Sequence, residues 1–408
     1  MNAALKHWKE AATVILAAKT RHSQSCDSLQ RSGEVAPACR GTCLPHKSAF
    51  DYEVLLLKRS GTSGFMPHAY VFPGGLLEPS DFSSEWTDLF KSFRTLPRFG
   101  VAMVKQPPET RPPIFATNRL KLGSPVPGDV ALRICAVRET FEECGVLLVL
   151  PSPVNGVSAD DETQKSDSNS SQLLLTTMPA QWDKNEIAKW RSLVIKNSSN
   201  FIRMCRELQC IPNIWALHEW GNWLTPTGVY EKQRRYDTAF YMCCLEDMPD
   251  TIEDEKEIVH FKWSTPSEIL HGFQNREFWI APPQFYDLGR MCHFHSLSDL
   301  HRFARQRAVE GCERWLPIIL VATDCLISLL PGDSLYPENV DYSGKTTSTM
   351  PTEKCLEELQ KESCNLHRIV KRDPYTVSVH INIMPKYKHV PPLISSATDC
   401  HLKSHSKL

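Results

Sequence analysis

The chain has 408 residues, of which 41% are hydrophobic and 23% are charged, and its formal net charge is −1. This composition is typical of a globular protein with a sizeable core, and the near-zero charge excludes a global field that would attract nucleic acid or an anionic membrane. No run of 18 apolar residues occurs, so no segment is predicted to span a bilayer. The fifteen cysteines are an odd number and include no C-x-x-C pair, which predicts reduced thiols rather than a disulfide framework.

The amino-terminal region combines a basic segment with a short apolar run. Residues 1–22 contain a single acid, Glu10, and can be interpreted as a presequence. The alternative is that residues 13–17 form the first strand of a domain, as the family resemblance described below implies. Residues 23–48 are polar and predict a surface loop, whereas residues 53–58 are rich in Val and Leu and predict the next strand.

Three carboxylates are concentrated on one predicted helical turn. Glu139, Glu142 and Glu143 stand at positions i, i+3 and i+4, so a helix directs all three to one side. Each pair repels by roughly a few tenths of a kcal/mol even in water, so a cation is expected beside them. The alternative is a solvated acidic face with Arg138 as its neighbour.

Further elements follow this acidic turn. Gly145 is the predicted C-cap of its helix, and residues 146–150 predict a buried strand. Residues 151–172 have the composition of a flexible loop. The later predicted elements are helices at 182–195 and 201–208, strands at 215–224, 235–245 and 258–263, a short helix from 265, one or two helices within 297–330 broken at Pro317, and a late strand at 375–384.

The acidic turn, together with a glycine pair upstream, resembles the Nudix hydrolases. The box of that family reads G-x5-E-x7-R-E-U-x-E-E-x-G-U, where U is apolar, and residues 131–146 match its second half. Gly75 and Asp81 match its first half, with Asp81 in place of the glutamate. We interpret the box as split by an insertion over residues 82–130, which is expected to loop out because closure entropy grows only logarithmically with loop length.

A second stretch resembles the coenzyme A diphosphatases of the same family. Residues 55–75 keep the spacing of their signature, L-L-T-x-R-[SA]-x3-R-x3-G-x3-F-P-G-G. Leu57, Gly64 and His68 stand where the signature has Thr, Arg and Gly. The resemblance extends over residues 13–270 and is closest to the peroxisomal acyl-coenzyme A diphosphatases.

The resemblance implies an α/β fold, namely a Nudix α/β/α sandwich with a mixed sheet. Three additions enlarge it: the box-splitting insertion, a helical insert and a C-terminal helical extension. The expected domains are a Nudix hydrolase domain over residues 8–270 with insertions at 82–130 and 151–212, a helical extension over 271–335, and a C-terminal segment over 336–408 with the late strand and a targeting tail.

The resemblance also implies roles for the acidic turn. Glu139 and Glu143 are the expected direct ligands of Mg²⁺ or Mn²⁺, because hard divalent cations prefer oxygen ligands. Glu142 is the expected third ligand or catalytic base, and Arg138 the catalytic residue that orients the carboxylates. A later loop often supplies another carboxylate in this family, and the acidic run at 253–257 is the candidate source, against the alternative of a solvated charge run.

The implied reaction is hydrolysis of the diphosphate of CoA and acyl-CoA to 3′,5′-ADP and (acyl-)4′-phosphopantetheine, by water that the metal makes more acidic. Arg59, Gly74 and Gly75 are the expected substrate-binding residues, the glycines because a Cβ would intrude where the backbone passes the helix. Other cations that can meet the 3′-phosphate, or simply be solvated, are Lys58, Arg234 and Arg235.

Two other functions stay open. One is a Nudix diphosphatase for another nucleotide, such as NADH, ADP-ribose or an RNA cap. The chain has no four-cysteine zinc module and no long basic stripe, which disfavours NADH and nucleic acid respectively. The other is a catalytically inactive Nudix fold that serves as a binding module, which the intact Glu139, Glu142 and Glu143 argue against.

The sequence finishes with Ser406, Lys407 and Leu408, a tripeptide that the peroxisomal import receptor recognises. It predicts the peroxisomal matrix as the location and the import receptor as a partner. The mitochondrion is the second choice, through the presequence interpretation of residues 1–22.

Overall fold

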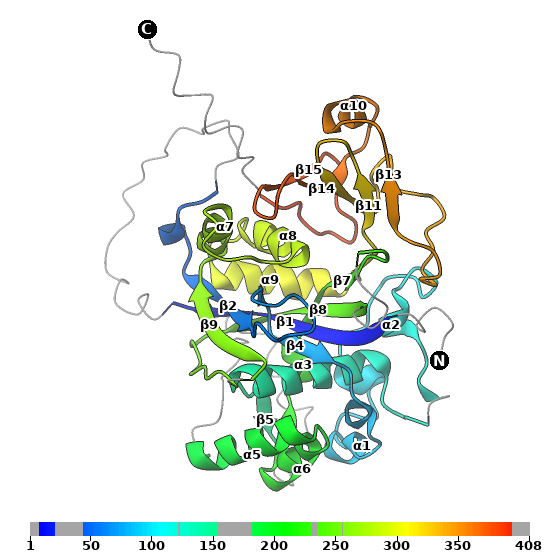
Figure 1. Ribbon diagram of the computed structural model, residues 1–408. Helices are drawn as coiled ribbons and strands as arrows, with labels where there is room; N and C mark the ends of the chain where they lie inside the picture. Colours follow the sequence, from blue (N-terminus) through cyan, green and yellow to red (C-terminus); the bar gives the residue numbers. More distant parts are fainter. Residues whose placement is uncertain are drawn as a thin grey trace.

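A mixed eight-stranded sheet forms the centre of the protein (Figure 1). The computed structural model describes residues 8–20, 44–120, 123–152, 182–229, 235–254 and 256–393. The strand order is β10-β7-β8-β1-β2-β3, with β4 paired to β1 and β9 paired to β2. The strands are β1 (Lys9–Lys19), β2 (Tyr52–Arg59), β3 (Tyr70–Val71), β4 (Gly74–Leu76), β7 (His218–Leu224), β8 (Tyr236–Leu245), β9 (Ile258–Ser264) and β10 (Arg314–Trp315).

Strand β1 lies in the middle of this sheet and separates two cores. It runs parallel to β8 and antiparallel to β2 and β4. Because side chains alternate between the two faces of a strand, Val14 and Leu16 enter one core while Ile15 and Ala17 enter the other. Burial on both faces explains the nearly unbroken apolar run, and the strands predicted at 13–17, 53–58, 215–224, 235–245 and 258–263 are confirmed.

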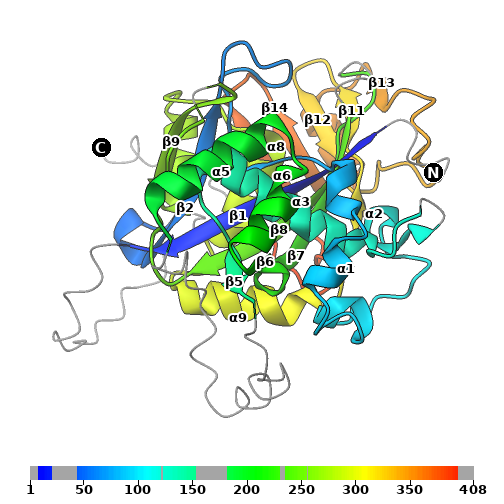
Figure 2. The same cartoon turned by 90° about the horizontal axis from the view of Figure 1, so that it is seen from below.

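Helices cover both faces of the sheet, which confirms the predicted α/β/α sandwich (Figures 1 and 2). One face carries α1 (Trp86–Leu89), α2 (Pro113–Ala116), α3 (Gly128–Cys144), α5 (Lys184–Lys196) and α6 (Asn200–Glu207). The other carries α7 (Pro266–Gln274), α8 (Pro282–Met291) and α9 (Leu297–Ala308). Short 3-10 turns occur at η3 (Lys47–Ala49), η4 (Pro79–Phe82), η5 (Pro97–Gly100) and η8 (Ile214–Ala216).

The expectation that residues 82–130 loop out of the domain is wrong. The segment forms α1, α2 and η5, and Arg111 within it makes a buried ion pair with Glu219 of β7 at 2.6 Å. Its large apolar side chains in the α3 core are Trp86, Phe90, Phe99, Ile114 and Phe115. The entropy of loop closure allows a long solvent-exposed loop at this point. The segment packs into the core instead, because that buries its aromatic side chains. The insertion is therefore part of the core.

The helical insert is confirmed in its described part, where α5 and α6 match the two predicted helices. Residues 153–181, in which a flexible loop was expected, lie outside the described residues.

The buried strand predicted at 146–150 is only partly correct. β5 (Val149–Pro151) pairs with β6 (Cys210–Pro212) in a separate two-stranded sheet. Val146, Leu147 and Leu148 are buried in the α3 core without forming strand. Their hydrophobicity thus reflects burial. A short apolar run does not by itself show whether the buried residues form a strand.

The predicted helical extension over 271–335 is helical only as far as α9, and the helix expected beyond it is wrong. β11 (Ile318–Val321) and β12 (Leu326–Leu329) instead pair antiparallel within a five-stranded sheet of order β13-β11-β12-β14-β15. The other members of this sheet and its one helix are β13 (Thr349–Pro351), α10 (Leu356–Lys361), β14 (His367–Lys371) and β15 (Val377–Ile381). A continuous apolar run of four residues is compatible with a helix or a strand. Here each run forms a strand because it pairs with the other in a hairpin. The late strand predicted at 375–384 is confirmed as β15.

Two expectations concern the chain as a whole. No helix in the described ranges is long and apolar enough to cross a membrane. The cysteines that the structure describes are free thiols, most of them buried, as their spacing predicted.

Candidate active site

Helix α3 presents its last two turns to a polar site. All of its residues are buried except Glu139 and Glu142, which are partly exposed. Gly145 ends the helix in the left-handed conformation, with φ 74°, and its N–H donates to the carbonyl of Phe141 at 3.0 Å. This is the predicted C-cap, and it fixes the end of the helix that carries the acidic turn.

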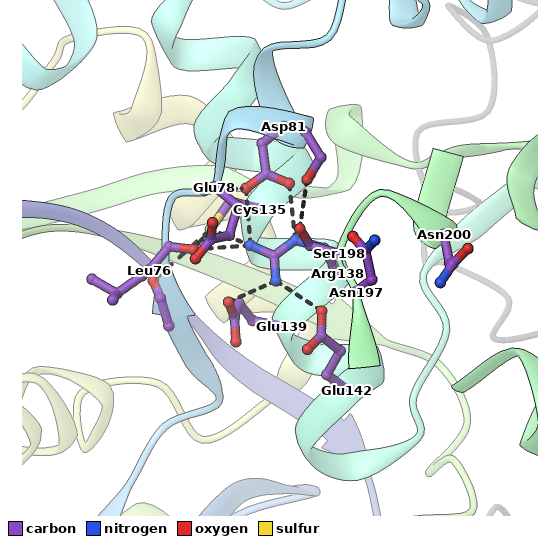
Figure 3. A network of polar contacts seen from close by, with 12 residues as sticks. Leu76, Glu78, Asp81, Cys135, Arg138, Glu139, Glu142, Asn197, Ser198 and Asn200 are labelled. Atoms are coloured by element: carbon purple, nitrogen blue, oxygen red, sulfur yellow. Dashed lines mark hydrogen bonds and ion pairs between the residues drawn. The ribbon is translucent and has the colours of Figure 1, made fainter. Parts of the chain in front are cut away.

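Arg138 is the centre of the site, although its side chain is only 2% exposed. Its Nε and Nη2 donate to the two carboxylate oxygens of Asp81, each at 2.9 Å (Figure 3). Its Nη1 donates to Glu139 at 2.7 Å and to Glu142 at 2.8 Å, and Nη2 also reaches the carbonyl of Leu76 at 2.9 Å. A planar guanidinium fixes the orientation of the carboxylates it contacts, so this geometry suits the orienting role that was predicted.

Asp81 reunites the two halves of the split box. It lies in η4, is 1% exposed, and its Oδ2 also accepts the backbone N–H of Glu78 at 2.9 Å. This tight turn brings the shorter aspartate side chain within reach of Arg138. The insertion therefore separates the halves of the box in sequence but not in space.

The glycine pair passes close to α3, as predicted. The N–H of Gly74 donates to Glu143 Oε2 at 2.8 Å, and a Cβ on Gly75 would lie 2.3 Å from Glu139 Oε2. Gly74 itself has φ 154°, and a Cβ there would lie 2.4 Å from the carbonyl oxygen of Ala12. Only glycines let β4 run this close to both β1 and the acidic turn. Contact of either glycine with substrate stays a prediction.

Burial raises the pKa of all three glutamates of the turn. It raises the pKa of Glu139 to about 8, against the opposing effect of Arg138 and with added repulsion from Glu142. It likewise raises the pKa of Glu142, which Arg138 again opposes. Burial, followed by repulsion from Glu139, holds the pKa of Glu143 well above its usual range. One guanidinium does not compensate these carboxylates, so an added cation is favoured here.

The donor set fits a hard divalent cation, because it consists of buried carboxylates with insufficient counter-charge. Within the described ranges, no three His, Cys, Asp or Glu side chains converge on a single point. Glu139 and Glu142 face Arg138, and Glu143 faces Gly74. Direct ligation by Glu139, Glu142 and Glu143 therefore stays a prediction.

Arg59 lies near the acidic turn and also holds its own loop. Its Nε and Nη2 donate to Ser63 Oγ at 3.0 and 2.8 Å, and Nε donates to the carbonyl of Phe65 at 3.0 Å. Its charge opposes the rise in the pKa of Glu143. The structure thus brings Arg59 to the site, while its contact with substrate stays a prediction.

His68 shows why the coenzyme A diphosphatase signature has a glycine at this position. Its φ is 63°, in the left-handed region that favours glycine. A Cβ on Gly61 would lie 2.5 Å from the imidazole of His68, so Gly61 makes room for the larger side chain. Gly64, where the signature has Arg, faces open space.

The other two candidate cations that the structure describes, Lys58 and Arg235, have contacts away from the acidic turn. Lys58 Nζ lies 5.9 Å from the ring centroid of Tyr70. Arg235 is 8% exposed and donates to the carbonyl of Gly344 at 3.1 Å, so it is not available to a phosphate. Arg234 lies outside the described residues.

Arg191, a neighbour of the site, was not predicted from the sequence, and Glu257 was predicted only as one member of an acidic run. Arg191 of α5 donates from Nε and Nη2 to the carbonyl of Glu142 at 3.0 and 2.8 Å, which places a cation at the C-terminal end of α3. The two residues are far apart in the sequence, so no local pattern connects them. In the acidic run, the charge of Glu257 raises the pKa of Glu142 and Glu143, which identifies it as the nearby member.

Matches to family models and to individual proteins identify the same family. Residues 8–291 match the model of the NUDT19 Nudix domain, and residues 319–382 match that of the NUDT19 C-terminal domain. The acyl-coenzyme A diphosphatase NUDT19 of Gallus gallus is 47% identical over 99% of this chain and 100% of its own length. The proteins of the same name from Xenopus laevis and Homo sapiens are 46% and 40% identical, over 96% and 97% of this chain and 97% of their own lengths.

Proposed function

This chain belongs to the NUDT19 family of Nudix hydrolases, and we propose that it hydrolyses the diphosphate of CoA and acyl-CoA. The products are 3′,5′-ADP and (acyl-)4′-phosphopantetheine. The observation that carries the proposal is the buried contact of Arg138 with Asp81, Glu139 and Glu142, which assembles both halves of a split Nudix box. The names of the full-length relatives supply the substrate class.

Nudix hydrolases use divalent metal ions, and we propose Mg²⁺ or Mn²⁺ for this chain. Glu139, Glu142 and Glu143 would hold it, since their buried oxygens lack sufficient counter-charge. A bound cation neutralises the diphosphate and makes water more acidic. Arg138 orients two of these carboxylates, and Glu142 would accept the proton.

The test uses the purified full-length protein with Mg²⁺ and either CoA or an acyl-CoA. We expect 3′,5′-ADP and the matching phosphopantetheine in equal amounts, and no reaction in EDTA. NADH, ADP-ribose and capped RNA, compared by kcat/KM under the same conditions, are the competing substrates. A higher kcat/KM for one of them would replace CoA in the proposal. Binding of CoA without turnover in the presence of either metal would support the inactive binding module.

Peroxisomal targeting is a separate proposal that depends on Ser406, Lys407 and Leu408, which lie outside the described residues. A fluorescent protein fused to the amino terminus should colocalise with a peroxisomal matrix marker. Deleting the three residues should move the fusion to the cytosol without changing turnover in vitro. If the deletion variant stayed in peroxisomes, the targeting proposal would be wrong. If the chain without an amino-terminal fusion entered mitochondria, the presequence interpretation would take its place.

A further inference from the structure

A pocket lies on the sheet face opposite α3, where the Nudix sheet meets the C-terminal part of the chain. It is lined by β7, by α8 and α9, by the turn that leads into β10, and by residues 385–389. The indole rings of Trp220, Trp223 and Trp315 are among its walls. Because α8 and α9 lie across the sheet from α3 (Figure 1), this pocket is separate from the acidic turn.

One cation of the pocket already has its counter-ion. Arg290 donates to Asp287 at 3.1 Å. The same carboxylate accepts the indole N–H groups of Trp220 at 3.0 Å and Trp223 at 3.2 Å. Asp287 is fully buried, so these three donors account for its charge.

Arg307 is a second cation of the pocket, and within the described ranges it contacts no carboxylate. Its Nη1 donates to the carbonyl of Gly311 at 3.0 Å, its Nη2 donates to the carbonyl of Glu219, and its Nε has no hydrogen-bond partner. The carboxylate of Glu219 is held by Arg111 at 2.6 Å. Arg307 is 2% exposed, and its guanidinium carbon lies 5.8 Å from the ring centroid of Trp220. Burial lowers its pKa to about 10 and Arg290 adds repulsion, while the charges of Glu219 and Asp287 oppose part of this fall.

A buried charge without a counter-ion is costly, and two carbonyl dipoles offset only part of that cost. We propose that this pocket binds one small anion, either a halide or a single carboxylate or phosphate group, as the counter-ion of Arg307. The unpaired Nε–H is the donor available to it. Lys386 and Glu313 also line the pocket and are paired with each other at 2.6 Å, so together they add no net charge to it.

The anion also fastens the C-terminal part of the chain to the Nudix domain. Residues 385–389 form one wall of the pocket, and the ring of His389 packs 4.6 Å from that of Trp220. Beyond this wall, Arg290 Nε donates to the carbonyl of Val390 at 3.1 Å. A filled pocket therefore bridges α9 to a segment about eighty residues later in the chain.

Iodide tests the proposal directly, because it quenches indole fluorescence and three tryptophans line the pocket. The full-length protein is titrated with iodide at constant ionic strength set by a HEPES salt. We expect a saturable quenching component on top of the linear collisional one. Chloride and phosphate in one series, and acetate and succinate in another, then compete with iodide and show which source of anion the pocket prefers. Linear quenching that none of these anions relieves overturns the proposal.

Two variants on the same helix locate the site. Arg307→Gln removes the buried charge, and we expect the affinity for iodide to fall by at least about tenfold, as for loss of a charge-assisted contact. Arg305→Gln is the matched control, since Arg305 is an exposed residue of α9, and it should bind within about twofold of the unmodified protein. Equal saturable quenching in both variants overturns the assignment.

A third variant covers the case in which Arg307→Gln does not fold. Trp315→Phe keeps an aromatic wall, so it should leave the affinity for iodide unchanged while reducing the saturable amplitude. An unchanged amplitude would place the quenched indoles elsewhere and overturn the proposal.

Discussion

The two faces of the central sheet bury opposite surpluses of charge. On the α3 face, the guanidinium of Arg138 contacts three carboxylates, namely those of Asp81, Glu139 and Glu142. The buried carboxylate of Glu143 accepts from the backbone of Gly74 instead. On the α8 face, Arg290 donates to the carboxylate of Asp287. Arg307 donates only to backbone carbonyls and lies over the ring of Trp220, so it contacts no carboxylate in the described part of the chain. Our two proposals therefore place a cation from solution on the first face and an anion from solution on the second.

This contrast shows how the same fold assigns different tasks to its two layers. The acidic surplus lies at a helix end beside a glycine pair, where two of the carboxylates remain partly exposed. The basic surplus lies between the Nudix sheet and residues 385–389, beside three indole rings. A partly exposed cluster suits chemistry on a substrate, whereas a buried charge between two parts of the chain suits their attachment to each other.

Removing the insertion should unfold the core on the α3 face of the sheet, and this is the largest effect we expect. Replacing residues 83–126 by a short Gly/Ser linker deletes five large apolar side chains from the core, each contributing roughly 1.5–3 kcal/mol. The shortened protein should lose its cooperative thermal transition, as followed by near-UV circular dichroism. A folded, metal-binding product would instead show that the insertion is dispensable.

Asp81→Asn tests whether the stability of the α3 face depends on the ion pair between Asp81 and Arg138. It keeps the shape of the side chain but leaves the buried Arg138 without its two-pronged partner, which should cost about 3–5 kcal/mol in the free energy of unfolding. Asp88→Asn is the control, because Asp88 is an exposed residue of α1, and it should change stability by less than about 0.5 kcal/mol. Urea denaturation measures both, and equal stability would contradict the central role of the pair.

Glu143→Gln should affect activity and stability in opposite directions. Loss of one carboxylate should lower kcat by at least about 100-fold, since metal-ion catalysis contributes several kcal/mol. In metal-free buffer the same change relieves repulsion with Glu139, so the melting temperature should not fall. Glu207→Gln, at an exposed position on α6, is the control for both measurements. Normal turnover by Glu143→Gln would contradict the metal assignment.

Mild acid should lower the free energy of unfolding, because His218 and His367, on the α8 side of the sheet, are held in the neutral form by burial. Burial lowers the pKa of His218 to about 3 and that of His367 to about 4. The unfolded chain binds protons below the ordinary pKa of about 6.5 while the folded chain does not, so stability is full above that pH and is lost as the pH falls. Each histidine should cost about 1 kcal/mol between pH 6.5 and 5.5.

The measurement is urea denaturation at pH 7.5, 6.5 and 5.5. His367→Gln should reduce the pH dependence, because His367 donates to the carbonyl of Pro331 and accepts from the hydroxyl of Tyr286 only when neutral. His260→Gln is the exposed control. Identical pH dependence in both variants would show that the acid sensitivity arises elsewhere.

The sequence by itself determined what depends on local spacing. The i, i+3, i+4 glutamates predicted one carboxylate-bearing side of a helix, and Gly145 predicted its end, because both follow from 3.6 residues per turn and from the conformational freedom of glycine. The strands around β1 were predicted from apolar, β-branched and aromatic content and, for residues 13–17, from the family resemblance. Apolar runs were less informative, since residues 318–329 form a hairpin where helix was expected.

Only the tertiary structure decided which distant residues meet. The pairing of Arg138 with Asp81, the contribution of residues 82–130 to the core and the unmatched charge of Arg307 all depend on contacts between residues far apart in the chain. Sequence patterns carry no distance information of this kind. The energy of a buried charge depends on the groups packed around it and not on its neighbours along the chain, so its need for a counter-ion becomes visible only in the folded protein.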